Sequence, residues 1–124
     1  MVQTSNEVSA EMSAVWEQFL QTKVNSFIKW DLVRFFHDNP HTTDTAENIA
    51  QYVGRDAKIV LRELDGLVKS EVLQTESVSG QRIYRLSDSE ETRRQIREFV
   101  AACHSREFRV KAINQVMGFS PRHD

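Results

Sequence analysis

The sequence contains few of the residues that cross-link, break or anchor a chain: one cysteine, two prolines and four glycines among 124 residues. A single cysteine, Cys103, excludes an intramolecular disulfide, and a free thiol is typical of reducing compartments. No stretch approaches the ~20 apolar residues of a membrane-spanning helix. Residues 1–10 also lack the basic and apolar regions of a secretion signal. We therefore expect a cytoplasmic protein that is neither secreted nor inserted into a membrane.

The sequence also lacks an excess of charge of either sign and any motif of a catalytic site. The formal net charge is −2, so composition alone does not indicate binding to nucleic acid. There is no G-x-S-x-G, H-E-x-x-H or P-loop motif, and the glycines are too scattered to surround a phosphate. We expect a protein that is not an enzyme and that needs no cofactor.

Apolar residues recur at helical spacing in the first third of the chain. The pattern over residues 7–25 predicts an amphipathic N-terminal helix. A second apolar run begins near Phe27 and ends where Asn39 and Pro40 interrupt a helix. The first stripe consists of Val8, Met12, Val15, Trp16, Phe19 and Leu20.

Two short helices with clear start and stop signals are predicted in the middle of the sequence. The segment Asp44-Thr45-Ala46-Glu47 has the spacing of a capping box, and the helix that follows ends at Gly54. Asp56 can cap the next helix, over residues 57–69. One face of this helix is apolar, with Val60, Leu64, Leu67 and Val68, and the opposite face carries Lys58, Arg62, Asp65 and Lys69.

The remaining sequence predicts a hairpin and a long final helix. Two β-prone runs, residues 72–77 and 82–86, flank a turn that contains Gly80, which is the pattern of a two-stranded hairpin. Ser87 or Asp88 can then cap a helix with an apolar stripe from Ile96 to Met117. The order of elements predicts one mostly helical α+β domain over residues 1–124, divided into an N-terminal helix (7–25), a core (26–86) and a C-terminal helix (87–118).

Residues 30–86 resemble the winged helix-turn-helix superfamily, in particular the ArsR-like and MarR-like bacterial transcription regulators. The resemblance implies that residues 57–69 form a recognition helix in the DNA major groove and that residues 72–86 form a wing on the DNA backbone. It further implies sequence-specific binding of double-stranded DNA by a homodimeric regulator. The matching residues are Leu32-Val33-x-Phe35-Phe36, Thr45-Ala46-Glu47-x-Ile49-Ala50, the Gly54 turn and Val60-x-x-x-Leu64-x-x-Leu67.

In this resemblance, basic side chains would bind phosphates and Arg62 would be the best candidate to read a base edge. Glu63 and Asp65 bring carboxylates to the same helix, where phosphates would repel them. A nearly neutral surface also suits a protein partner, so the alternative is a winged-helix interaction module without DNA binding. The expected DNA-binding residues are Lys58, Arg62, Lys69, Arg82 and Arg85.

The first and last helices carry more apolar surface than one winged domain needs. In the resembling regulators such helices form a two-fold dimer, which places two recognition helices about one DNA turn apart. Alternatively, the two helices pack against each other within one chain. Arg106 and Glu107 interrupt the stripe, either to fix the register of a dimer or to mark an exposed turn. The expected interface residues are Met12, Trp16, Phe19, Val110, Ile113 and Met117.

One group of potential metal ligands lies in the predicted final helix. His104 and Glu107 would share one helical face, and ArsR-like regulators often sense metals with such residues. The matching pair nearer the helix start is absent, because Glu91-Thr92-Arg93 offers no histidine and its arginine repels a cation. Cys103 falls in the apolar stripe and is expected to be an inert core residue. We expect no metal site, and the sequence identifies no effector.

Overall fold

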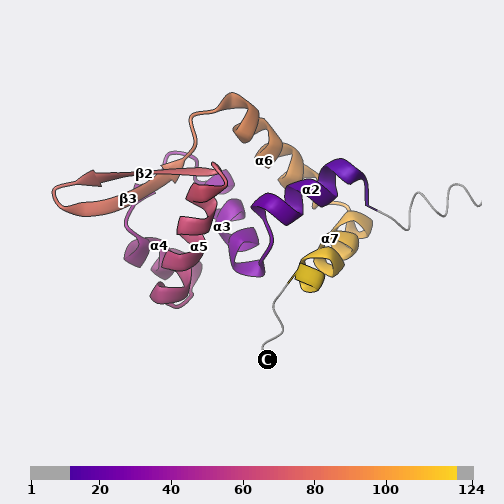
Figure 1. Cartoon of the computed structure of the whole chain (residues 1–124), viewed down its shortest axis with the longest axis horizontal. Helices are drawn as coiled ribbons and strands as arrows, with labels where there is room; N and C mark the ends of the chain where they lie inside the picture. The colour runs from indigo at the N-terminus through magenta and orange to yellow at the C-terminus, as the bar shows by residue number, and fades with distance from the viewer. Residues whose placement is uncertain (1–11, 120–124) are drawn as a thin grey trace, which may run out of the picture.

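The computed structural model describes residues 12–119, which form six helices and a three-stranded antiparallel sheet. The mostly helical α+β class predicted from the sequence is confirmed for this part of the chain. In Figure 1 the sheet, α4 and α5 lie toward one end, and α2, α6 and α7 lie toward the other, with α3 between them. The elements are α2 (Ala14–Lys23), α3 (Phe27–Asp38), β1 (Thr43–Asp44), α4 (Ala46–Val53), α5 (Ala57–Lys69), β2 (Leu73–Val78), β3 (Gln81–Leu86), α6 (Glu90–Ala102) and α7 (Arg106–Phe119).

The first described helix, α2, is shorter than the helix predicted over residues 7–25. It begins after Ser13, whose side chain accepts a hydrogen bond from the backbone N–H of Trp16, and it ends at Lys23. Ser26 then caps α3 in the same way, so the chain turns between two capped helices. Residues 7–11 of the predicted helix lie outside the described residues.

The structure confirms both short central helices, with one change at the first cap. Thr45, not Asp44, caps α4, and the Asp44 carboxylate accepts hydrogen bonds from the Thr45 N–H and the Asn48 side chain. Gly54 ends α4 with a left-handed φ of 70°, which a glycine adopts without steric cost. Asp56 caps α5 by accepting from two backbone N–H groups. Local chemistry therefore fixes the turn between α4 and α5.

The sheet has one more strand than predicted. Strands β2 and β3 form the expected hairpin, from Leu73↔Leu86 to Val78↔Gln81, but the two-residue strand β1 also pairs with β3. The prediction of a two-stranded sheet is therefore wrong in strand number, because two residues are too few to show an alternating pattern. The hairpin turn itself is Ser79–Gly80, with both φ angles positive, as two-residue hairpin turns require.

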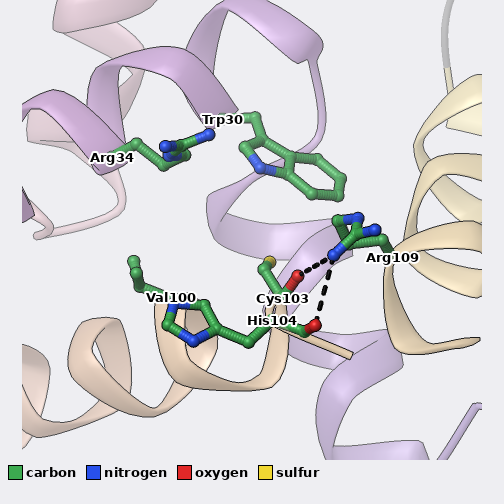
Figure 2. Close-up of a pocket in the computed structure, with 6 residues that line it drawn as sticks. All are labelled: Trp30, Arg34, Val100, Cys103, His104 and Arg109. Carbon is green, nitrogen blue, oxygen red and sulfur yellow. Dashed lines mark hydrogen bonds between the residues drawn. The ribbon is translucent and has the colours of Figure 1, made fainter. Parts of the chain in front are cut away.

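The predicted final helix over residues 87–118 is in fact two helices. The chain leaves the helical path at residues 103–105, and the Ser105 side chain accepts from the Phe108 N–H at the start of α7. The Arg109 guanidinium donates to the carbonyl oxygens of Cys103 and His104 at 2.8 and 3.3 Å (Figure 2). These bonds satisfy carbonyls that a helix end leaves unpaired. The prediction of a single long helix is therefore wrong, and Arg106 and Glu107 are the first residues of α7, directly after the turn.

One apolar core runs through all the described helices and the hairpin. Helix α2 packs against α7, and α3 contacts α4, α5 and α6. At the end formed by α2, α6 and α7, the rings of Trp16, Phe19, Phe99 and Phe108 pack at centroid distances between 5.2 and 6.2 Å. This aromatic cluster joins three helices within one chain. None of the helices between residues 12 and 119 is long and apolar enough to cross a membrane.

Candidate nucleic-acid interface

Helix α5 separates buried and charged side chains on opposite faces. Its inner stripe, Val60, Leu64 and Leu67, is completely buried. The outer stripe repeats at i, i+4, i+7 and i+11, which is the spacing of one helix face. It consists of Lys58, Arg62, Asp65 and Lys69, and we call it the α5 outer stripe. The predicted orientation of this helix is therefore confirmed.

The cations of the α5 outer stripe are exposed and weakly engaged. The side chain of Arg62 is 73% exposed, and its Nε lies 3.8 Å from the Glu63 carboxylate, too far for a hydrogen bond. Lys58 and Lys69 are exposed and make no ion pair with any residue between 12 and 119. The three charges therefore face solvent and are available to a ligand.

The carboxylate of Glu63 lies between Arg62 of the α5 outer stripe and two residues of the α3 region. Its side chain is only 17% exposed, accepts a hydrogen bond from Ser26 Oγ at 2.9 Å and lies 3.7 Å from Lys29 Nζ. Lys29 crosses α5 at Gly66, where an added Cβ would come within 2.8 Å of the lysine Cε. Glu63 is thus part of a bridge between α3 and α5, where the positive charge of Lys29 opposes the repulsion between this carboxylate and an anion.

The carboxylate of Asp65 lies on the stripe but is occupied. Its Oδ1 accepts from the buried Tyr84 hydroxyl at 2.7 Å and lies 3.2 Å from Arg82 Nη2. The Arg82 guanidinium also lies over the Tyr84 ring, 5.4 Å from its centroid. Burial, followed by the hydrogen bond to Asp65, raises the pKa of Tyr84 to about 12. Asp65 therefore anchors the hairpin to α5.

The two arginines predicted on the hairpin point to different faces. Residues 82 and 85 of one strand are separated by an odd number of positions, so their side chains alternate. Arg82 joins the α5 outer stripe through Asp65, whereas Arg85 pairs with Asp88 at 2.9 Å and lies 3.8 Å from Glu76. The hydrogen bond to Asp88 raises the pKa of the Arg85 guanidinium. The structure thus separates Arg85 from the other four predicted residues.

A surface hollow of about 200 Å³ lies between Leu61 of α5, the start of α4 and the hairpin. It holds one further carboxylate, that of the exposed Glu47. Leu61, which is 42% exposed, also lies in the hollow and adds an apolar contact surface. The lining residues are Thr45, Ala46, Glu47, Leu61, Gln81, Arg82 and Tyr84.

The residues predicted for a dimer interface divide into two groups. Phe19 is only 6% exposed and Trp16 contributes to the aromatic cluster, so both serve the core of a single chain. Met12 is also packed against that core. This arrangement matches the intramolecular alternative for the N-terminal helix. Val110, Ile113 and Met117, in contrast, form an exposed apolar face on α7 at i, i+3 and i+7.

The residues considered as metal ligands do not share a helical face. His104 lies in the turn after α6 and Glu107 in the first turn of α7, where it pairs with Lys111 at 3.5 Å. Residues 12–119 contain no group of three histidine, cysteine, aspartate or glutamate side chains placed to hold a metal ion. Cys103 is half-buried, not fully buried as expected, because it lines a cavity at the end of α6.

Sequence reasoning missed the partners of the acidic residues on α5. Glu63 finds its partners on α3, and Asp65 finds its partners on β3, 19 residues along the chain at Tyr84. Glu63 lies three residues after Val60 and one before Leu64, so the helical spacing places it beside the buried stripe. This spacing is the one local sign that its side chain lies inward.

Comparison with protein-family models, curated proteins and solved structures finds no match to this chain.

Proposed function

We propose that this protein binds double-stranded DNA as a homodimeric, winged helix-turn-helix transcription regulator. In this proposal α4 and α5 are the helix-turn-helix pair, joined by the turn at Gly54, and the β2–β3 hairpin is the wing. Helix α5 would enter the major groove with its outer stripe. Helix α3 and the buried side of α5 would hold the recognition helix in position.

One observation carries the proposal: the carboxylates near the α5 outer stripe are hydrogen-bonded within the protein, while the cations of the stripe make only one long ion pair, between Arg62 and Glu63. Glu63 is turned toward Ser26 and Lys29, and Asp65 is bound by Tyr84 and Arg82. Lys58, Arg62 and Lys69 remain exposed along about 16 Å of helix, since each residue of an α-helix rises ~1.5 Å. Such a row of cations suits the regularly spaced phosphates of a duplex.

The second part of the proposal is a dimer through α7. Val110, Ile113 and Met117 place three large apolar side chains on one exposed helix face. A second copy of the same face would cover it in a two-fold interface. This differs from the interface expected from the sequence, because Trp16 and Phe19 are used inside one chain. Two α5 helices in one dimer would then contact one palindromic site.

A protein-interaction module is the second candidate, and one observation favours it. Leu61 is exposed beside the α5 outer stripe, and Glu47 adds a carboxylate to the same hollow. Apolar and acidic groups near the centre of a surface favour binding of a protein over binding of DNA phosphates. In this alternative the same face of α5 binds another protein.

The deciding experiment measures binding of a random-sequence duplex by fluorescence anisotropy at several salt concentrations. Non-specific DNA binding by such proteins has dissociation constants of about 10⁻⁴ to 10⁻⁶ M and weakens with salt. Lys58→Ala with Arg62→Ala should lower the slope of log affinity against log salt by about two, because two phosphate contacts are lost.

The matched control is Arg94→Ala with Arg97→Ala, which removes two exposed arginines from α6 and leaves the net charge equal to that of the test variant. This control should bind like the unchanged protein. Equal binding by Lys58→Ala/Arg62→Ala would show that the α5 outer stripe is the wrong surface. No binding by the unchanged protein at low salt would favour the interaction module.

A further inference from the structure

Leu61 is a large apolar side chain on the outside of α5, beside the α5 outer stripe. It is 42% exposed, whereas the neighbouring Val60 and Leu64 are completely buried. Within residues 12–119, neither the buried core nor the partly buried apolar residues packed against that core include Leu61. The fold therefore makes little use of this side chain.

Leu61 borders two surface hollows of the protein. The first is the hollow of about 200 Å³ toward α4 and the hairpin. The second, of about 430 Å³, lies along α5, and Leu61 is the one apolar side chain among its described lining residues. These residues are Lys58, Leu61, Arg62, Asp65, Gly66 and Lys69, so they include all three cations of the α5 outer stripe. A partner that approaches these cations thus also meets an apolar side chain.

Helical spacing places Leu61 between charged neighbours. It follows Lys58 by three residues and precedes Asp65 by four, so the three side chains are neighbours on the helix surface. In the proposed complex α5 lies in the major groove, where cations contact phosphates and the side chains between them face the base edges. Leu61 would therefore face the bases and not the phosphates.

The major groove of DNA presents one kind of apolar group, the C5 methyl of thymine. The other groups on the base edges are mainly hydrogen-bond donors and acceptors. A leucine over those groups would remove them from water without giving them a hydrogen bond, which costs free energy. Contact with the methyl group instead removes apolar surface of both partners from water. The contact of Leu61 with DNA is thus most favourable at a thymine.

We propose that Leu61 is a specificity-determining residue that selects thymine through its C5 methyl group. This inference rests on the proposed binding of DNA by α5. Phosphates are the same in every sequence, so contacts of Lys58 and Lys69 with phosphates supply affinity without discrimination. Leu61 adds discrimination at one base pair, and the proposed dimer would require this thymine in both half-sites of its target.

The test begins with the selection of target sequences from a random duplex library by the unchanged protein. Each thymine of the selected site is then replaced by uracil, which pairs with adenine in the same way and lacks only the methyl group. Fluorescence anisotropy measures the affinity for each duplex. At one thymine of each half-site, uracil should lower the affinity about four-fold, which corresponds to one buried methyl group.

Leu61→Ala should bind the thymine and uracil duplexes equally at that position, because it lacks the side chain that contacts the methyl group. Leu61 lies outside the core, so this variant should fold normally. The matched control is Val15→Ala, which truncates an exposed apolar residue of α2. This control should keep the four-fold preference for thymine.

The proposal is overturned if the selection enriches no sequence, if no thymine is sensitive to uracil, or if Leu61→Ala keeps the preference of the unchanged protein. These results leave the proposed DNA binding intact, because salt-dependent binding of a random duplex is measured separately. No binding of any duplex at low salt overturns both proposals and favours a protein as the partner of Leu61.

Discussion

Helices α5 and α7 are almost equal in length, with 13 and 14 residues, but they distribute their apolar side chains differently. Helix α5 buries Val60, Leu64 and Leu67 completely and exposes mainly charged residues on its outer stripe. Helix α7 buries only Ala112 and Val116, while its larger Met117 is 57% exposed. The same type of element thus presents a polar surface at one end of the molecule and an apolar surface at the other.

This difference suits the two helices to partners of different chemistry. A charged face is stable in water and is suited to a charged ligand, whereas a row of exposed aliphatic side chains gains free energy when another apolar surface covers it. The proposed function uses both properties, with α5 against DNA and α7 against a second copy. The following variants test the comparison, from the largest expected effect to the smallest.

Truncation in the buried stripe of α5 should have the largest effect. Leu64→Ala should lower the free energy of unfolding by about 2–5 kcal/mol, because Leu64 is fully buried and its loss leaves a cavity. The corresponding change on α7, Val116→Ala, removes two carbons and should cost about 2 kcal/mol. Urea denaturation of both variants measures the difference, and an equal or larger loss for Val116→Ala would break the comparison.

Charge placed on the outer face of α7 should dissociate the proposed dimer. Ile113→Glu with Met117→Glu puts carboxylates at exposed apolar positions, and each occurs twice in a two-fold interface. The dissociation constant should rise by about a hundred-fold or more, because charges would be removed from water without partners. Solution mass measured by light scattering over a range of concentrations detects the change.

The control places the same residue type on α5, as Lys58→Glu with Arg62→Glu. This variant should keep the mass of the unchanged protein and lose DNA binding, because the two faces serve separate contacts. A monomeric control, or a dimeric Ile113→Glu/Met117→Glu variant, would contradict the assignment of the two faces.

The hydrogen bond from Tyr84 to Asp65, which anchors the hairpin to α5, should make the protein less stable at alkaline pH. The pKa of Tyr84 is raised from 10.0 to about 12, so the folded protein keeps this proton where the unfolded chain releases it. Stability from this group is therefore complete below pH 10 and falls as the pH rises toward 12. In Tyr84→Phe the free energy of unfolding should decrease less between pH 10 and 12 than in the unchanged protein. Urea denaturation of both proteins at pH 9 to 12 measures this difference.

The smallest effect is expected at the turn after α5. Glu71 has a φ of 69°, a left-handed conformation that costs a residue with a side chain about 1–2 kcal/mol. Glu71→Gly should raise the free energy of unfolding by about 1 kcal/mol, since the relief of strain exceeds the entropy cost of glycine. Glu71→Ala keeps the strain and serves as the control. A glycine variant no more stable than the alanine variant would remove strain as the explanation.

Most of the central region could be predicted from the sequence because its signals are local. Asp56 caps α5 through N–H groups two and three residues away, and Gly54 ends α4 through its own backbone angles. The buried stripe of α5 likewise follows from spacing alone, so the exposed positions of Lys58 and Arg62 were predicted correctly. Interactions within one or two helical turns are readable without knowledge of the fold.

The sequence-based predictions are wrong where the local structure depends on contacts with residues far away in the sequence. The break between α6 and α7 contains neither glycine nor proline, and the Arg109 side chain stabilises it from the following helix. Strand β1 exists only because β3 is beside it. For the candidate site, the net effect of Glu63 depends on Ser26, which is 37 residues away.

The packing of α7 against α2 has a consequence for synthesis of the protein on the ribosome. The aromatic cluster includes Trp16 near one end of the described chain and Phe108 near the other. Chains are made from the N-terminus, and earlier segments fold as they emerge. The indole of Trp16 and the rings of Phe19 and Phe99 therefore stay open on one side until residue 108 has left the exit tunnel. During that interval the nascent chain exposes an apolar aromatic surface that chaperones or other nascent chains can bind.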